Sequence, residues 1–159
     1  TLYSYFPDKR VLFTEVVTTE CRSLAERAAS LIDASVPARE ALAIAAGQIV
    51  PFLLSDFAQR CFRICMAERD RFPELGEAYY LSGPKNGQCT LVRFLKDAAE
   101  RGELVIEDFN MAADQFVELC KARLWVRAVF GIQSEFTDEE INEVVENAVE
   151  TFMARYGAR

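Results

Sequence analysis

The chain has 159 residues, of which 51% are hydrophobic, so it can bury one sizeable core and its length does not require a second one. It has 18 Lys and Arg and 25 Asp and Glu. The resulting formal charge of −7 disfavours a surface that neutralises nucleic-acid phosphates by itself. The sequence contains no histidine, which excludes Ser-His and Cys-His pairs and His-based metal sites.

Other signatures of catalysis are also missing from the sequence. The segment 83–87 contains two glycines, but it lacks the spacing of a phosphate-binding loop and no strand precedes it. The acidic run 138–140 is explained by the start of a helix, where acids are favourable. We therefore expect no enzyme, no cofactor and no metal site.

The sequence gives no sign of a membrane or secretory protein. The longest nearly apolar run, 41–54, is interrupted by Gln48 and is shorter than the roughly 20 residues of a membrane-spanning helix. Five cysteines are an odd number without secretory context, so they are expected to be reduced thiols. We expect a cytoplasmic protein that does not contact a membrane.

Apolar residues recur at intervals of three and four along nearly the whole chain, and no stretch alternates as a strand would. The sequence therefore predicts an all-α fold. The predicted helices span 9–34, 37–54, 56–72, 74–82, 84–101, a segment from Asp108 or Asn110 to Phe130, and 138–156.

Several helix ends have specific signals. Pro7 predicts a break, after which Asp8 is placed to cap the first long helix. Ser55 is a suitable N-cap for the third segment, and Pro51 should kink or end the helix before it. Thr137 and Glu140 have the spacing of a capping box, which predicts the start of the last helix.

The last predicted helix is apolar over more than one narrow stripe, which one neighbouring helix cannot cover. This surplus predicts a second packing partner. Its apolar residues are Ile141, Val144, Val145, Ala148, Val149, Phe152 and Met153.

The first residues, Thr-Leu-Tyr-Ser-Tyr-Phe, are followed by a turn and by Lys9. This pattern resembles the end of the helix-turn-helix in tetracycline-repressor (TetR) type transcriptional regulators. The resemblance implies that Thr1, Tyr3, Tyr5 and Lys9 contact DNA. It also implies that 1–7 are a remnant of the recognition helix and turn, with most of the helix-turn-helix missing, and that 8–159 are the effector-binding and dimerisation domain.

Later segments extend the resemblance to nearly the whole chain, through their order and spacing. The segments 67–75, 79–84, 101–104 and 148–157 are similar to the AefR-like branch of that family. The resemblance implies about six to seven helices and a homodimer in which the last two helices of each subunit form a four-helix bundle. The residues assigned to the dimer interface are Trp125, Ile141, Val145, Ala148 and Phe152.

The resemblance also implies an effector pocket between the long helix 9–34 and the middle helices. The middle helices carry many large apolar side chains, which favours a pocket for a small hydrophobic molecule. A repressor of this kind releases operator DNA when the effector tilts the long helix. The residues predicted to line the pocket are Phe57, Cys61, Cys65, Phe94, Phe116 and Tyr79.

A second interpretation is a helical protein-interaction or cysteine-based redox-sensing module without a DNA partner. Cys61 and Cys65 lie one helical turn apart, but no nearby basic cluster lowers the pKa of a thiol. The coding sequence upstream of Thr1 distinguishes the two interpretations. A three-helix basic segment there is expected for the regulator, and an initiator Met is expected for the alternative.

Overall fold

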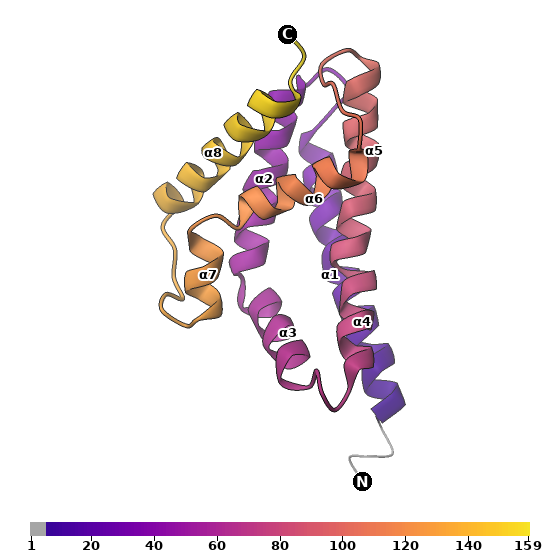
Figure 1. Ribbon diagram of the computed structural model, residues 1–159. Helices are drawn as coiled ribbons and strands as arrows, with labels where there is room; N and C mark the ends of the chain where they lie inside the picture. The colour runs from indigo at the N-terminus through magenta and orange to yellow at the C-terminus, as the bar shows by residue number, and fades with distance from the viewer. Residues whose placement is uncertain (1–5) are drawn as a thin grey trace.

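Eight α-helices make up the regular structure of residues 6–159, which are the part of the chain that this computed structural model describes (Figure 1). The all-α prediction is confirmed. The first described turn of α1 and the C-terminus lie at opposite ends of the molecule. The helices are α1 (Phe6–Leu31), α2 (Ala38–Leu54), α3 (Asp56–Ala67), α4 (Pro73–Ser82), α5 (Pro84–Glu100), α6 (Phe109–Cys120), α7 (Leu124–Val129) and α8 (Asp138–Tyr156).

The first long helix differs from its prediction at both ends. α1 already includes Pro7 and Asp8, because proline is tolerated in the first turn of a helix, so the predicted Asp8 cap is wrong. The residues predicted to precede the break, 1–5, lie outside the described part of the chain. The helix ends at Leu31 rather than at residue 34. Beyond it, the carboxylate of Asp33 accepts a hydrogen bond from the backbone N–H of Ser35 at 2.7 Å and another from its hydroxyl, which favours a turn over a further helical turn.

The helix predicted to end at Phe130 is divided into α6 and α7. Arg123 breaks it with a φ of 69°, in the left-handed region that side chains rarely adopt. The Arg123 guanidinium lies 2.6 Å from a carboxylate oxygen of Glu143 on α8, and this ion pair links the break to the last helix. Asp108, not Asn110, caps α6, because its side chain accepts from the N–H of Met111 at 2.9 Å.

Two predicted caps are present. The Thr137 hydroxyl accepts from the N–H of Glu140 at 3.1 Å, and the Glu140 carboxylate accepts from the N–H of Thr137 at 2.9 Å, which completes the capping box of α8. The bond from the Thr137 backbone lowers the pKa of Glu140. Ser55 caps α3 by accepting from the N–H of Ala58 at 3.2 Å. That helix ends at Ala67, earlier than predicted.

α2 and α3 meet at an elbow. α2 continues past Pro51 to Leu54, and Ser55 is both its C-cap and the N-cap of α3. The two helix axes are bent by 56° relative to each other. No single described helix is long and apolar enough to cross a bilayer, and among the described helices only this bent pair has the required length and composition when its two helices are taken together. The elbow turns α3 away from α2.

The core lies where α8 packs against α2 and α6 (Figure 1). Phe116 on α6 and Phe152 on α8 meet edge to face with ring centroids 5.3 Å apart, and both are at most 1% exposed. The Tyr156 hydroxyl donates to the side chain of Gln115, which satisfies a polar group at the end of this core. The broad apolar surface of α8 is therefore covered by two helices of the same chain.

This packing corrects part of the predicted dimer interface. Val145, Ala148 and Phe152 are 9%, 2% and 1% exposed within one chain, so they are core residues and have little surface left for a partner. Trp125 and Ile141 are only half-buried. The exposed side of α8 is instead acidic, with Glu139, Glu143, Glu146 and Glu150.

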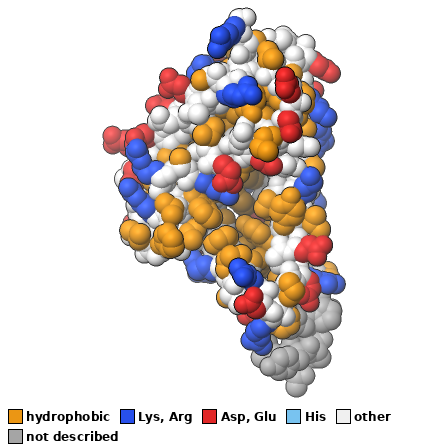
Figure 2. All heavy atoms as spheres, in the orientation of Figure 1, with side chains coloured by type: hydrophobic (Ala, Val, Ile, Leu, Met, Phe, Trp, Pro, Cys, Tyr) orange, Lys and Arg blue, Asp and Glu red, His pale blue; other side chains and the backbone are white. Residues whose placement is uncertain are grey.

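Hydrophobic side chains are exposed at a different place, on and just after α7. Val126, Phe130 and Ile132 are 44%, 73% and 74% exposed, and we call these three residues the α7 patch. Figure 2 shows hydrophobic side chains gathered across the middle of the visible face, at the level of α7 in Figure 1. A monomer seldom exposes such groups together without a partner.

The core position of Phe152 predicts a large effect on stability. Phe152→Ala should lower the free energy of unfolding by about 3–5 kcal/mol, because it leaves a cavity beside Phe116. Met111→Ala truncates a large apolar side chain at a site on α6 that is 52% exposed, and it should change stability by less than about 0.5 kcal/mol. Urea unfolding followed by circular dichroism measures both, and equal losses would contradict this description of the core.

Candidate functional site

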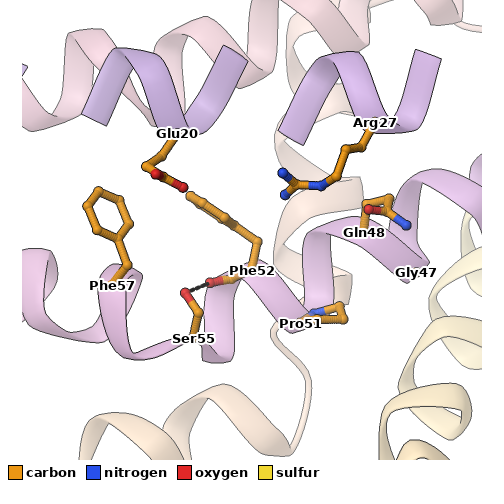
Figure 3. Close-up of a pocket in the computed structure, with 8 residues that line it drawn as sticks. All are labelled: Glu20, Arg27, Gly47, Gln48, Pro51, Phe52, Ser55 and Phe57. Carbon is orange, nitrogen blue, oxygen red and sulfur yellow. Dashed lines mark hydrogen bonds between the residues drawn. The ribbon is translucent and has the colours of Figure 1, made fainter. Parts of the chain in front are cut away.

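A cavity of about 460 Å³ lies between α1, α2 and the first turn of α3 (Figure 3). This volume is in the range that holds a small organic molecule. α1 forms one wall, and α2 with the start of α3 forms the other. The cavity is lined by Glu20, Arg27, Gly47, Gln48, Pro51, Phe52, Ser55 and Phe57.

Small and flat residues on α2 leave this space open. Gly47 lies in the middle of α2, and a Cβ added there would have no atom within 4 Å. Phe52 and Phe57 stand on the two sides of the elbow, with ring centroids 6.4 Å apart and an interplanar angle of 50°. The Ser55 hydroxyl already has hydrogen-bond partners in the protein, because it donates to the carbonyl of Phe52 at 2.6 Å and accepts from the N–H of Ala58 as the cap of α3. The wall is therefore mainly apolar and aromatic.

Two opposite charges from α1 line the same cavity. Glu20 lies beside Phe52 and Phe57, whereas Arg27 lies beside Gln48 at the other end (Figure 3). The two residues are seven positions apart, which is about 10 Å along a helix that rises 1.5 Å per residue. Neither side chain forms an ion pair with another side chain that the structure describes.

The six side chains predicted to bind a ligand occupy three different places. Phe57 lines the cavity. Phe116 is fully buried in the α6–α8 core, and the half-buried Phe94 packs against the same core, so neither lines this cavity. The prediction treated all inward-facing residues of the middle helices as one group, but α6 packs its inward residues against α8, and α5 packs against α6.

Cys61, Cys65 and Tyr79 belong to a separate cluster, which includes Cys21 of α1. Burial is the main reason that the pKa of the Cys21 thiol rises to about 11, and a neighbouring Cys61 adds to the shift. Burial likewise raises the pKa of Cys65 to about 11 and that of Tyr79 to about 12. The Tyr79 ring also packs against Phe13 of α1, with centroids 6.3 Å apart. We call Cys21, Cys61, Cys65 and Tyr79 the thiol cluster.

The thiol cluster is poorly suited to redox sensing. Oxidants react with the thiolate, and burial raises the pKa of all three cysteines and keeps them protonated. Within residues 6–159, no group of three or more Cys, Asp or Glu side chains is arranged to hold a metal ion. The cluster is better described as packing between α1, α3 and α4.

The residues that sequence reasoning missed are mainly polar. Glu20 and Arg27 lie outside the apolar stripe of α1, and this pattern is typical of a solvent-facing surface. One usable signal was present in the sequence. Gly47 stands inside a strongly apolar helix, where glycine costs about 1 kcal/mol relative to alanine and leaves a position without a side chain.

Most of the predicted DNA contacts lie outside the described residues. Thr1, Tyr3 and Tyr5 are in the part that the structure does not describe. Lys9 falls in the first turns of α1, but its side chain is likewise outside the description.

Cysteine accessibility gives a direct check of the burial pattern. Alkylation with iodoacetamide at pH 8 should label the exposed Cys89 first. Burial raises the pKa of Cys120 to about 12, so this thiol should react only after unfolding. Mass spectrometry of peptides taken over time measures the order, and early labelling of Cys120 would contradict the packing around α6.

Comparison with known proteins places this geometry in a family. Residues 40–158 match the family described as AefR-like transcriptional repressor, C-terminal domain. No curated protein matches the chain at a comparable level. Among solved structures, the Flavonoid-responsive Regulator FrrA is 30% identical and has a TM-score of 0.77, with 100% of this chain and 80% of that chain covered.

Two further solved structures are similar. A putative TetR-family transcriptional regulator from Mesorhizobium loti MAFF303099 is 25% identical with a TM-score of 0.79, over 99% of this chain and 80% of that one. A TetR family transcriptional regulator from Pseudomonas syringae pv. tomato str. DC3000 shares the fold at 21% identity and a TM-score of 0.60, over 99% of this chain and 78% of that one. These neighbours are regulators rather than enzymes. The chain therefore belongs to the TetR family of transcriptional regulators, and its residues 40–158 form an AefR-like C-terminal domain.

Proposed function

We propose that the chain is the effector-binding and dimerisation part of a ligand-responsive transcriptional repressor. A small hydrophobic molecule binds in the cavity between α1, α2 and α3, and the occupied protein releases operator DNA. The observation that carries this proposal is that α1 is itself a wall of the cavity. A relative at 30% identity is a flavonoid-responsive regulator, which supports a small aromatic effector.

The long helix α1 acts as a lever in this mechanism. It has 26 residues, or about 39 Å at 1.5 Å per residue, and Glu20 stands about 21 Å from its first described residue. A ligand that pushes on Glu20 or Arg27 therefore moves the far end of α1 by more than it moves the cavity wall. Two recognition helices of a dimer must match half-sites about 34 Å apart, so a small tilt disrupts their spacing.

The required energies are modest. A ligand that prefers the tilted state a hundredfold supplies about 2.7 kcal/mol to the shift. Burying about 250 Å² of apolar ligand surface at roughly 25 cal/mol per Å² gives some 6 kcal/mol before ordering costs. With one or two hydrogen bonds, this suffices for micromolar-range binding.

The proposed assembly is a homodimer that uses the α7 patch. Half-site recognition requires two subunits, and Val126, Phe130 and Ile132 are the exposed apolar residues closest in sequence to α8. Trp125 and Ile141 are half-buried and stay in the proposed interface beside these three residues. Trp125 is anchored there by Phe62, with ring centroids 5.3 Å apart.

Operator DNA is contacted, in this proposal, through Thr1, Tyr3, Tyr5 and Lys9 and through helix-turn-helix residues before them. The net charge of −7 agrees with this division, because an acidic effector domain needs a separate basic surface for phosphates. A repressor that works in this way acts in the cytoplasm.

Filling the cavity should remove effector binding without unfolding the protein. Gly47→Phe places a ring in the open space that faces the missing Cβ. The variant should lose the rise in melting temperature that planar aromatic compounds cause by mass action in the parent chain. In the full-length gene product, it should stay bound to DNA selected from a random pool when the compound is added, as measured by mobility shift.

The matched control is Gly87→Phe on α5, where an added Cβ also has no atom within 4 Å but the residue does not line the cavity. This variant should keep the response of the parent. If both variants respond to the compound like the parent, the effector binds elsewhere.

The dimer surface is tested by charge. The double variant Phe130→Glu and Ile132→Glu should be monomeric in sedimentation, because two carboxylates would be buried without partners in the interface. Met111→Glu adds a carboxylate at a similarly exposed apolar residue on α6 and should remain dimeric. A dimeric double variant would remove the α7 patch from the proposal.

A further inference from the structure

We infer that the cavity takes a planar aromatic acid of about two fused rings that also carries a hydroxyl group at its far end. The acid faces Arg27, the hydroxyl faces Glu20, and the rings lie against Phe52 and Phe57. This inference rests on the proposed function and deepens it by naming the chemical class of the effector.

The shape of the ligand follows from the walls. Phe52 and Phe57 present two rings with centroids 6.4 Å apart, and Pro51 adds a third rigid apolar face from the same side. Aromatic rings prefer offset or edge-to-face contacts with other rings, which a flat ligand provides at low entropic cost. The opposite wall is one face of α1, and at Gly47 no side chain fills the gap.

Arg27 selects an anionic group. Its neighbours one turn away on α1 are Ser23, Leu24, Ser30 and Leu31, so no acid on its own helix neutralises it. No acid from α2 or α3 is paired with it either. A guanidinium presents a planar fork of donors that matches a carboxylate bidentately. The Gln48 amide on the same side can add one hydrogen bond.

Glu20 selects a donor at the opposite end. Its neighbours one turn away are Val16, Val17, Ser23 and Leu24, so it has no basic partner on its own helix. Its negative charge adds to burial in raising the pKa of the Cys21 and Cys61 thiols, and these two neighbours supply no positive charge. An ionised carboxylate only accepts hydrogen bonds, so it favours a hydroxyl and repels a second acid.

The spacing of the two charges sets the ligand's length. Glu20 and Arg27 are about 10 Å apart along α1. A rigid ring system with an acid and a hydroxyl on opposite ends can face both side chains at once, and two fused rings fit in a cavity of about 460 Å³. The opposite signs of the charges also determine which way round the ligand lies.

Three naphthalene compounds with the same ring system test the inference by isothermal titration calorimetry on the full chain. They are 6-hydroxy-2-naphthoic acid, 2-naphthoic acid, which lacks the hydroxyl, and 2-naphthol, which lacks the acid. The first should bind most tightly. Arg27→Gln should weaken binding of both acids about tenfold, as expected for one charge-assisted contact, and leave 2-naphthol unchanged.

Glu20→Gln should weaken binding of the two hydroxyl compounds about threefold to tenfold and leave 2-naphthoic acid unchanged or slightly tighter. Arg22→Gln and Glu26→Gln change the same residue types at exposed positions of α1 that do not line the cavity, and they should bind like the parent. Circular dichroism checks that all four variants are folded.

Two results would overturn the inference in different ways. If all three compounds bind equally and Arg27→Gln does not discriminate among them, the charge assignment is wrong while the cavity remains a hydrophobic effector site. If no compound binds the parent, and hydrophobic compounds in general leave its melting temperature unchanged, both the inference and the proposed function fail.

Discussion

The packing of α8 against α2 and α6 is the constraint on which the rest of the structure depends. Phe116 and Phe152 pair in this core with almost no exposed surface, and α2 packs along the same α8 on one side. α1 lies on the other side of α2 and also packs against α4 and α5. The cavity is therefore bounded by a fixed wall on α2 and by a helix that is anchored outside the central core. A helix outside the close-packed core needs less free energy to move than a helix inside it.

The elements were predictable because helix signals are local. Apolar spacing, the Thr137 capping box and the Ser55 cap each depend on a few neighbouring residues, and the structure contains all of them. The break at Arg123 was not predictable in the same way. The break contains no glycine or proline. Arg123 adopts a positive φ there, and its side chain forms an ion pair with Glu143, twenty residues later in the chain. That contact exists only in the folded chain.

The functional site was harder to predict than the fold. Periodicity shows which face of a helix is buried, but not which neighbour buries it, so Phe116 and Phe57 could not be told apart as core and cavity residues. The same limit placed Phe152 in a subunit interface, although α2 and α6 cover it within one chain. Glu20 and Arg27 were missed for the opposite reason. A charged residue outside the apolar stripe is usually solvated, and only the position of α2 shows that these two face a cavity.

The most direct test of the central claim is a crystal structure of the protein grown with 6-hydroxy-2-naphthoic acid. We expect the ring system between Phe52 and Phe57 on one side and α1 on the other, with α1 tilted relative to α2 and α8 when compared with ligand-free crystals. A ligand found among the buried residues of the α6–α8 core, or in the thiol cluster, would contradict the assignment of this cavity. An occupied cavity with α1 unmoved in the dimer would contradict its role as a lever.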